Sequence, residues 1–305
     1  MNETLSKWSG GYAEWVDGET AFLSIVFTWE LDRALTRALF FRACGYRVRI
    51  GGPAIFQEKL QHDLLELDGV QLGGDIPDAI ARHNPAATVF SQGCPKKCWF
   101  CIVPKMHGNT FILIPDAPVR PVLCDNNLSA LDAKYQDHII ARYMAEGVPL
   151  RDANSGFEPE TFTPDVYERW KPLLNAGRGP WRFAYDELAE RDDVLRVMKM
   201  LVDEPAKRKQ VYVLIGNEPF EDCMRRIQEV IDHGCEPYVQ PVIKLTALER
   251  KVWVQDRLGW TERQLLQVQR WANRHIWRSS PFADYDGRIK TGRRDRYDTQ
   301  HGLFV

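Results

Sequence analysis

Short apolar segments alternate with helix-forming segments between residues 87 and 243, and this alternation constrains the fold more than any other feature of the chain. Alternating strands and helices form parallel sheets with right-handed helical crossovers. Six such units are too few for an eight-stranded barrel, so we expect an α/β fold built on a partial (β/α)6 parallel barrel. Its strands are predicted at residues 88–90, 121–124, 151–156, 181–185, 211–215 and 238–243. The spacing of apolar residues predicts helices over 130–144, from Thr163 onward, over 194–202 and over 220–231.

The residues before this core predict a short N-terminal βαβ unit. A strand over 22–28, a helix over 30–44 and a strand over 47–50 follow one another, so the two strands are expected to be parallel. The first twenty residues are expected to form an irregular arm. Residues 56–85 are expected to be a short helical or loop connection.

The residues after the core predict a C-terminal helical extension that ends in a basic tail. Thr261 is expected to cap a helix over 261–277. Residues 270–305 carry seven Arg and one Lys against four Asp, which fits either a solvated extension or a contact with nucleic acid. We therefore divide the chain into three parts, which are residues 1–84, 85–245 and 246–305.

Composition and charge exclude several classes of protein. The 305 residues include 40 Lys and Arg against 42 Asp and Glu, so bulk positive charge does not hold this chain on nucleic acid. The longest apolar run, over residues 21–29, is far shorter than the ~20 residues that span a bilayer. The N-terminus lacks the basic region of a signal peptide. We therefore expect a cytoplasmic protein with no membrane partner.

Three of the seven cysteines lie within eight residues of one another. An odd number of cysteines in a reducing compartment does not indicate a disulfide framework. Cys94, Cys98 and Cys101 have the spacing C-x3-C-x2-C, which lets three thiolates on one loop bind a soft metal centre and leaves one coordination position open. Lys96 and Lys97 are expected to stabilise the thiolates and a cluster with net negative charge. The alternative is a structural zinc site with His107 as the fourth ligand.

The run from Gly93 to Pro104 resembles the cluster motif of the radical S-adenosylmethionine (SAM) superfamily, C-x3-C-x-aromatic-C. Cys94, Cys98, Phe100 and Cys101 match that motif. The surrounding residues are most similar to methylthiotransferases and cobalamin-type members, and the resemblance covers residues 85–245, the proposed radical SAM core. The N-terminal unit resembles a truncated Rossmann-like domain.

The resemblance implies a metal-binding enzyme with a 4Fe-4S cluster and SAM as cofactors. The three cysteines would bind three irons, and SAM would bind the fourth. A reductant protein such as a flavodoxin or ferredoxin would supply the electron that cleaves SAM to a 5′-deoxyadenosyl radical, which abstracts hydrogen from the substrate. The substrate is not identified by the sequence, and a nucleotide or nucleic-acid base is one candidate.

The resemblance also suggests cofactor-binding residues at the ends of the predicted strands. Each of them has a structural alternative, such as a turn or a helix cap for the group at the second strand. Asp125, Asn126 and Asn127 take the place of a segment that accepts hydrogen bonds from the SAM amine. The other candidates are Phe100 beside the adenine, Ser155 at the third strand, Asp186 at the fourth and Gly216 at the fifth.

Two other functions remain open from the sequence. The first is a non-catalytic iron–sulfur protein for electron transfer or sensing, which would bind no SAM. The second is a zinc protein, which would be colourless. Binding of SAM to an iron–sulfur cluster distinguishes the enzyme from both.

Overall fold

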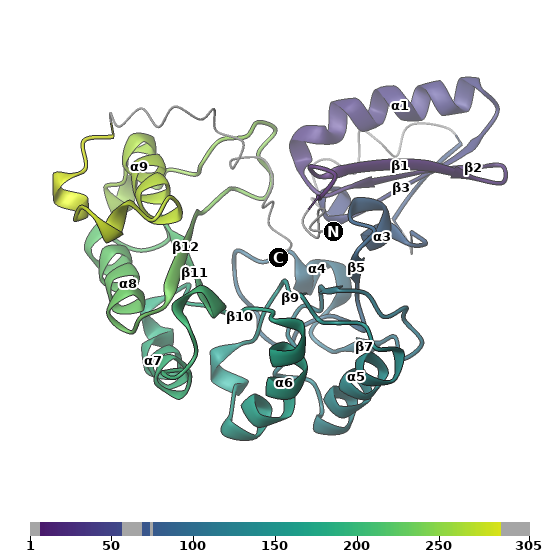
Figure 1. Cartoon of the computed structure of the whole chain (residues 1–305). Helices are drawn as coiled ribbons and strands as arrows, with labels where there is room; N and C mark the ends of the chain where they lie inside the picture. The colour runs from purple at the N-terminus through teal and green to yellow at the C-terminus, as the bar shows by residue number, and fades with distance from the viewer. Residues whose placement is uncertain (1–6, 57–68, 74–75, 288–305) are drawn as a thin grey trace.

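The computed structural model describes residues 7–56, 69–73 and 76–287, and in these residues the chain has a mixed α/β fold with several parallel sheets. None of the sheets closes into a barrel within the described residues. Two of them form the central part of the molecule, and an arc of helices surrounds them (Figure 1). No described helix combines the length and the apolar character needed to cross a bilayer.

The predicted alternation of strands and helices is confirmed. One parallel sheet contains β5 (Ala87–Thr88), β8 (Val122–Leu123) and β9 (Asp152–Ala153). A second contains β10 (Trp181–Ala184), β11 (Lys209–Ile215) and β12 (Glu236–Pro241). A parallel bridge between Phe157 and Phe183 connects the residues after β9 to β10, so the six strands follow one another in chain order.

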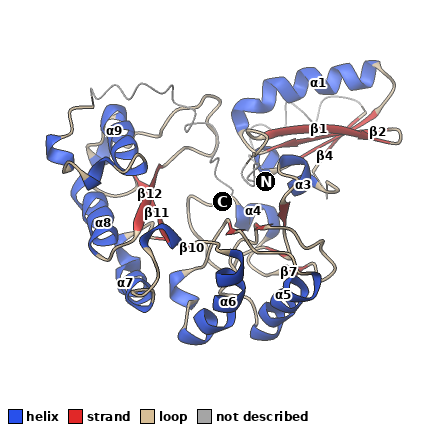
Figure 2. Ribbon diagram, in the orientation of Figure 1, coloured by secondary structure: helices blue, strands red, loops and turns tan. Residues whose placement is uncertain are grey.

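The helices between these strands lie on the outer side of the arc (Figures 1 and 2). Thr163 caps α6 and Thr261 caps α9, as predicted, because each hydroxyl accepts a hydrogen bond from a backbone N–H in the first turn. The helix α9 packs against β12 and ends earlier than predicted. The helices are α5 (Ala133–Glu146), α6 (Pro164–Gly177), α7 (Arg191–Met200), α8 (Phe220–Asp232) and α9 (Glu262–Asn273).

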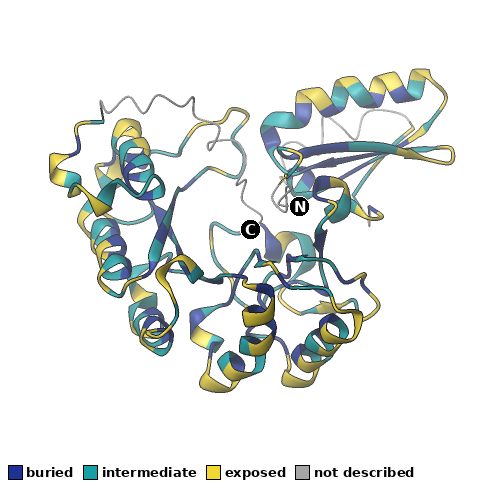
Figure 3. Ribbon diagram, viewed as in Figure 1, coloured by how far each residue is buried: buried dark blue, intermediate teal, exposed yellow. Residues whose placement is uncertain are grey.

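Alternate residues of the central strands point to opposite sides of the arc, as the two-residue period of a strand requires. Trp181 and Phe183 of β10 lie in the core beneath the helices, as do Val211 and Val213 of β11. The exposed residues of the helices lie on their outer faces (Figure 3). The residues between these apolar positions face the inner side of the arc.

The N-terminal part is a separate four-stranded sheet with α1 (Leu31–Ala43) on it. The predicted βαβ unit is confirmed, because β2 and β3 pair in parallel. The predicted irregular arm is wrong from Tyr12 onward, because β1 pairs antiparallel with β2 through a tight turn that Gly18 allows with a φ of +54°. Residues 1–6 of the predicted arm lie outside the described part. The strands are β1 (Tyr12–Asp17), β2 (Thr20–Ile25), β3 (Arg47–Gly51) and β4 (Val70–Leu72).

The predicted connection over 56–85 contains β4 and the short helix α3 (Ala79–His83), and its residues 57–68 and 74–75 lie outside the described part. The predicted basic tail lies outside it from residue 288 onward. After β6 (Ser91–Gln92), the cysteine segment leads into α4 (Val103–His107) and then β7 (Ile112–Leu113), which pairs antiparallel with β6.

Gly177 tests how closely the end of α6 packs against the segment that leads into β9. A Cβ at this position would lie 1.8 Å from the carbonyl oxygen of Leu150. Replacing a helical glycine with alanine normally stabilises a protein by about 1 kcal/mol, but this contact reverses the sign. We predict that Gly177→Ala lowers the free energy of unfolding by about 2 kcal/mol or more in chemical denaturation. The exposed Glu168→Ala in the same helix should change it by less than about 0.5 kcal/mol, and a stabilised Gly177→Ala would contradict the packing.

Candidate functional site

Cys94, Cys98 and Cys101 line one cavity of about 420 Å³ on the inner side of the arc. This volume lies in the range of small-molecule sites. Inner-face residues of β9 to β12 form one wall of the cavity, and residues after β2 and β3, including Phe27 and Pro53, form another. The cavity therefore lies between the central strands and the N-terminal sheet.

Three consecutive residues after β8 fix the start of the cysteine segment. Asp125 accepts hydrogen bonds from the backbone N–H of Phe90 (3.0 Å) and from the hydroxyl of Ser91 (2.6 Å). Asn126 accepts one from the N–H of Gly93 (3.0 Å). The amide of Asn127 donates to the sulfur of Cys94 (3.4 Å). The two segments therefore bind each other residue by residue, and the first cysteine has a defined position.

Gly93 is required at the turn before Cys94. Its φ is +96°, and a Cβ would lie 2.2 Å from the carbonyl oxygen of Thr110. A side chain at this position would separate the cysteine segment from the strand pair β6 and β7.

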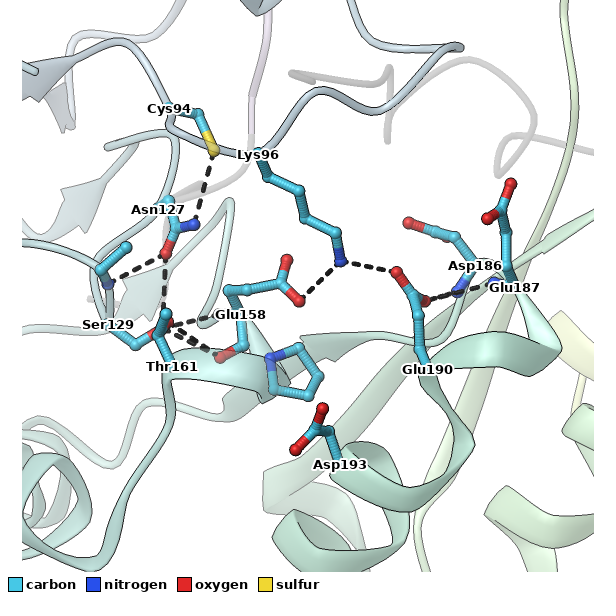
Figure 4. A network of polar contacts seen from close by, with 12 residues as sticks. Cys94, Lys96, Asn127, Ser129, Glu158, Thr161, Asp186, Glu187, Glu190 and Asp193 are labelled. Atoms are coloured by element: carbon cyan, nitrogen blue, oxygen red, sulfur yellow. Dashed lines mark hydrogen bonds and ion pairs between the residues drawn. The ribbon is translucent and has the colours of Figure 1, made fainter. Parts of the chain in front are cut away.

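Lys96 connects the cysteine segment to both central sheets. Its Nζ lies 2.7 Å from Glu158, which follows β9, and 2.6 Å from Glu190, which precedes α7 (Figure 4). The other oxygen of Glu190 accepts hydrogen bonds from the backbone N–H groups of Asp186 and Glu187. Burial opposes the charge of Lys96, but the bonds to the two carboxylates outweigh it and raise the pKa of the ammonium.

The thiols of Cys98 and Cys101 are protonated in this environment unless a metal replaces the protons. Burial raises the pKa of Cys98 to about 12, against the lowering effect of Lys96, and raises the pKa of Cys101 to about 11. The charge of Cys101 adds to the shift at Cys98, and the charge of Cys94 adds to the shift at Cys101. The N–H of Val103 donates to the sulfur of Cys101 (3.4 Å).

The donor set fits a soft metal centre in its chemistry. Three thiols face one cavity, and N–H donors are directed at two of the sulfurs, as in iron–sulfur sites. The side chains are not gathered into a closed ligand set, since no three His, Cys, Asp or Glu of the described residues are placed to hold a metal ion. His107, the alternative fourth ligand, does not line the cavity.

Most of the predicted cofactor residues line this cavity together with the cysteines. Burial and the charge of Glu190 raise the pKa of Asp186 to about 7. The hydroxyl of Ser155 is buried and has no hydrogen-bond partner among the described residues. The predicted residues that line the cavity are Phe100, Asn126, Asn127, Ser155 and Asp186.

Asp125 and Gly216 do not line the cavity. Asp125 is fully buried, and both of its carboxylate oxygens bind the chain, so its position differs from the one expected beside the SAM amine. Gly216 has a φ of +85°, and its carbonyl accepts a hydrogen bond from Gln255 (3.1 Å). It therefore joins the end of β11 to the C-terminal extension. Cys124 is also buried, outside the cavity lining.

Sequence reasoning missed a charged pair on the inner face. Arg182 of β10 binds both oxygens of Asp152 of β9 (2.8 and 3.1 Å) and donates to the hydroxyl of Tyr212 on β11. The available signal was the polar residues at alternate positions of β10 to β12, because parallel strands covered on both faces are normally apolar throughout. These residues are Arg182, Gln210, Tyr212, Tyr238 and Gln240.

We predict that Lys96→Met lowers the free energy of unfolding by about 2 kcal/mol. Removing one partner of a buried ion pair costs about 3–5 kcal/mol, and this group is less deeply buried, since 25% of the Lys96 side chain is exposed. Lys97→Met, in the same segment but exposed, is the matched control and should change stability by less than about 0.5 kcal/mol. Equal effects of the two substitutions in chemical denaturation would rule out the role of Lys96.

Asp125 should make stability depend on pH. Burial raises its pKa to about 6 against the bonds from Phe90 and Ser91. The folded state then binds more protons than the unfolded state between about pH 4 and 6, so stability falls as the pH rises through this window. Asp125→Asn keeps an acceptor for Phe90 and removes the charge. We expect the variant to show a smaller loss of stability between pH 5 and pH 7.5 in urea denaturation, and an unchanged slope would contradict this.

No known protein family, no curated protein and no solved structure matches this chain in comparisons of sequence and fold. The motif and the geometry of the cavity are therefore the basis for a function. The cysteine segment, the residues that fix it and the polar inner face all belong to one site.

Proposed function

We propose that the protein is a radical SAM enzyme that holds a 4Fe-4S cluster with Cys94, Cys98 and Cys101. The observation that carries the proposal is the motif C-x3-C-x-aromatic-C on a segment whose three cysteines face a cavity lined by polar residues at the strand ends. A cavity of this size beside the cysteines suits an enzyme, because an electron-transfer protein needs no room for SAM and a substrate.

The proposal includes an open partial (β/α)6 barrel built from β5, β8, β9, β10, β11 and β12. Three features support an open barrel. The parallel strands follow one another in chain order, a bridge connects the two sheets, and the helices between the strands lie only on the outer side. The pair of Arg182 with Asp152 also joins β9 to β10. In barrels of this kind the active site lies at the carboxyl ends of the strands, which is where the cysteine segment is.

A 4Fe-4S cluster held by Cys94, Cys98 and Cys101 would supply the electron that cleaves SAM to methionine and a 5′-deoxyadenosyl radical. The chain's own residues bind and orient the reactants. Asn127 and the N–H of Val103 donate to sulfurs, which tunes a bound cluster. Ser155 and Asp186 offer an unpaired hydroxyl and a carboxylate to the polar groups of SAM, and Phe100 lies in the same cavity for the adenine.

The reaction also needs an electron donor from outside the chain. We propose a flavodoxin or ferredoxin in the reducing cytoplasm, because a cluster with an accessible iron is sensitive to oxidants. The substrate is a molecule that donates hydrogen.

We predict that Cys98→Ala abolishes SAM cleavage and most of the bound iron. The anaerobically reconstituted protein is reduced with dithionite, and iron and 5′-deoxyadenosine are measured. Cys44→Ala, an exposed cysteine distant in sequence from the motif, is the control and should retain both. Iron and turnover retained by Cys98→Ala would contradict the ligand assignment. An intact cluster that binds no SAM would instead indicate an electron-transfer or sensing protein.

A further inference from the structure

The inner face of the central strands is polar over several layers below the cysteine segment. In the register of the sheet, Arg182 lies beside Gln210, Tyr212 beside Tyr238, and Leu214 beside Gln240. All six side chains line the cavity that the cysteines share. The cavity therefore extends from the strand ends down along the inner face, where a closed barrel would be filled with branched apolar side chains.

Two cations that line the cavity, Arg182 and Lys96, are each bound by carboxylates of the chain, whereas the exposed Lys244 also lines it and has no ion pair among the described residues. Arg182 donates hydrogen bonds to both carboxylate oxygens of Asp152 and to the hydroxyl of Tyr212. The ammonium of Lys96 forms ion pairs with Glu158 and Glu190. A phosphate or carboxylate at either cation would have to displace a carboxylate that is already in place. Along the strands and at Lys96, this pairing favours an uncharged ligand.

Two amide side chains on the same wall are unpaired. Gln210 on β11 and Gln240 on β12 line the cavity, and neither side chain makes a hydrogen bond to any residue that the structure describes. The register separates them by four residues, or about 13 Å along the strands. An amide offers both a donor and an acceptor. A ligand that satisfies the two must therefore be extended and carry both kinds of group.

The middle of the wall suits a flat ring. Tyr212 and Tyr238 contact each other edge to face, with ring centroids 5.4 Å apart. The neighbour of Tyr212 on β10 is the small Ala184, and the guanidinium of Arg182 lies 5.6 Å from the centre of the Tyr212 ring. Val26 and Phe27 of the N-terminal part supply an apolar surface to the same cavity. Aromatic neighbours favour a planar heterocycle over a flexible peptide chain.

We infer that this wall is a substrate subsite for an uncharged nucleoside, with Gln210 at its deep end and Gln240 near the cofactor. A nucleoside has a planar base with donors and acceptors at one end and ribose hydroxyls at the other, which matches the order of amides and rings along the wall. The inference rests on the proposed function for its chemistry, because the nucleoside is the molecule that would lose hydrogen. Its binding is a separate property of the chain.

The test is binding of adenosine, guanosine, cytidine and uridine, each titrated calorimetrically into the full-length, anaerobically reconstituted protein. Saturating SAM without reductant fills the adenosine site of the cofactor and prevents turnover. At least one nucleoside should bind, and its 5′-monophosphate should bind no more tightly. Gln210→Leu should weaken binding about tenfold, because it leaves one polar group of the ligand unpaired. Gln228→Leu, an exposed glutamine of α8, is the matched control and should have no effect.

Gln240→Leu provides a second variant if Gln210→Leu does not fold, which circular dichroism shows. Absence of binding by all four nucleosides would overturn the inference, as would tighter binding of the monophosphates or an affinity unchanged in both folded variants. Binding of a blocked neutral dipeptide in place of nucleosides would overturn it as well. Iron content and SAM affinity are measured on the same samples. A protein without iron or SAM affinity that still binds a nucleoside through Gln210 would contradict the proposed function and keep the subsite.

Discussion

The residue-by-residue contact between the segment after β8 and the start of the cysteine segment determines the geometry of the site. Asp125, Asn126 and Asn127 make four hydrogen bonds to the segment that runs from Phe90 to Cys94. Two of these bonds come from backbone N–H groups of that segment. Lys96 then fixes the middle of the segment to the residues after β9 and β10, and α4 directs the N–H of Val103 at Cys101. Three thiols on a segment without regular structure are thereby held by three different elements, which is how a binding segment acquires a defined shape.

The polar inner face requires the rest of the molecule to supply the stability. Most of the apolar side chains of β8 to β12 are buried beneath the outer helices, in two cores that include Trp170, Trp181 and Trp271. The inner side faces the cavity, whose opposite wall is formed by residues after β2 and β3 of the N-terminal part. Thr28 of the N-terminal part donates to the carbonyl of Ala247, and Glu30 pairs with Arg250, so the N-terminal sheet is fastened to the segment after β12. These contacts connect the N-terminal part to the segment after β12, and residues next to them on both sides, such as Phe27 and Lys244, line the cavity.

Local signals in the sequence predicted the strands, the helices and the caps at Thr163 and Thr261, because each depends on neighbouring residues. The strand β1 was not predicted, since Gly10 and Gly11 before it suggest irregular structure and its hydrogen bonds come from β2. The sequence also identified Asp125 as an acceptor of hydrogen bonds. Its partners, Phe90 and Ser91, lie 35 and 34 residues away, and only the tertiary fold shows that they belong to the chain and not to a cofactor. The pair of Arg182 with Asp152 was not predicted either, because the two residues are 30 positions apart and only the tertiary fold brings them together.

The composition of the inner face argues for binding more strongly than any single contact. Stability alone favours apolar side chains there, because a polar group that loses water without gaining a partner costs about 1–3 kcal/mol. Gln210 and Gln240 avoid this cost only while the cavity holds water or a ligand that binds them. A fold keeps such residues where binding requires them, and local departures from the stabilising pattern concentrate at functional sites. The cysteine segment at one end and Gln210 at the other therefore line one continuous cavity, in which the cysteine end is rigidly held and the deep end is left open for a partner.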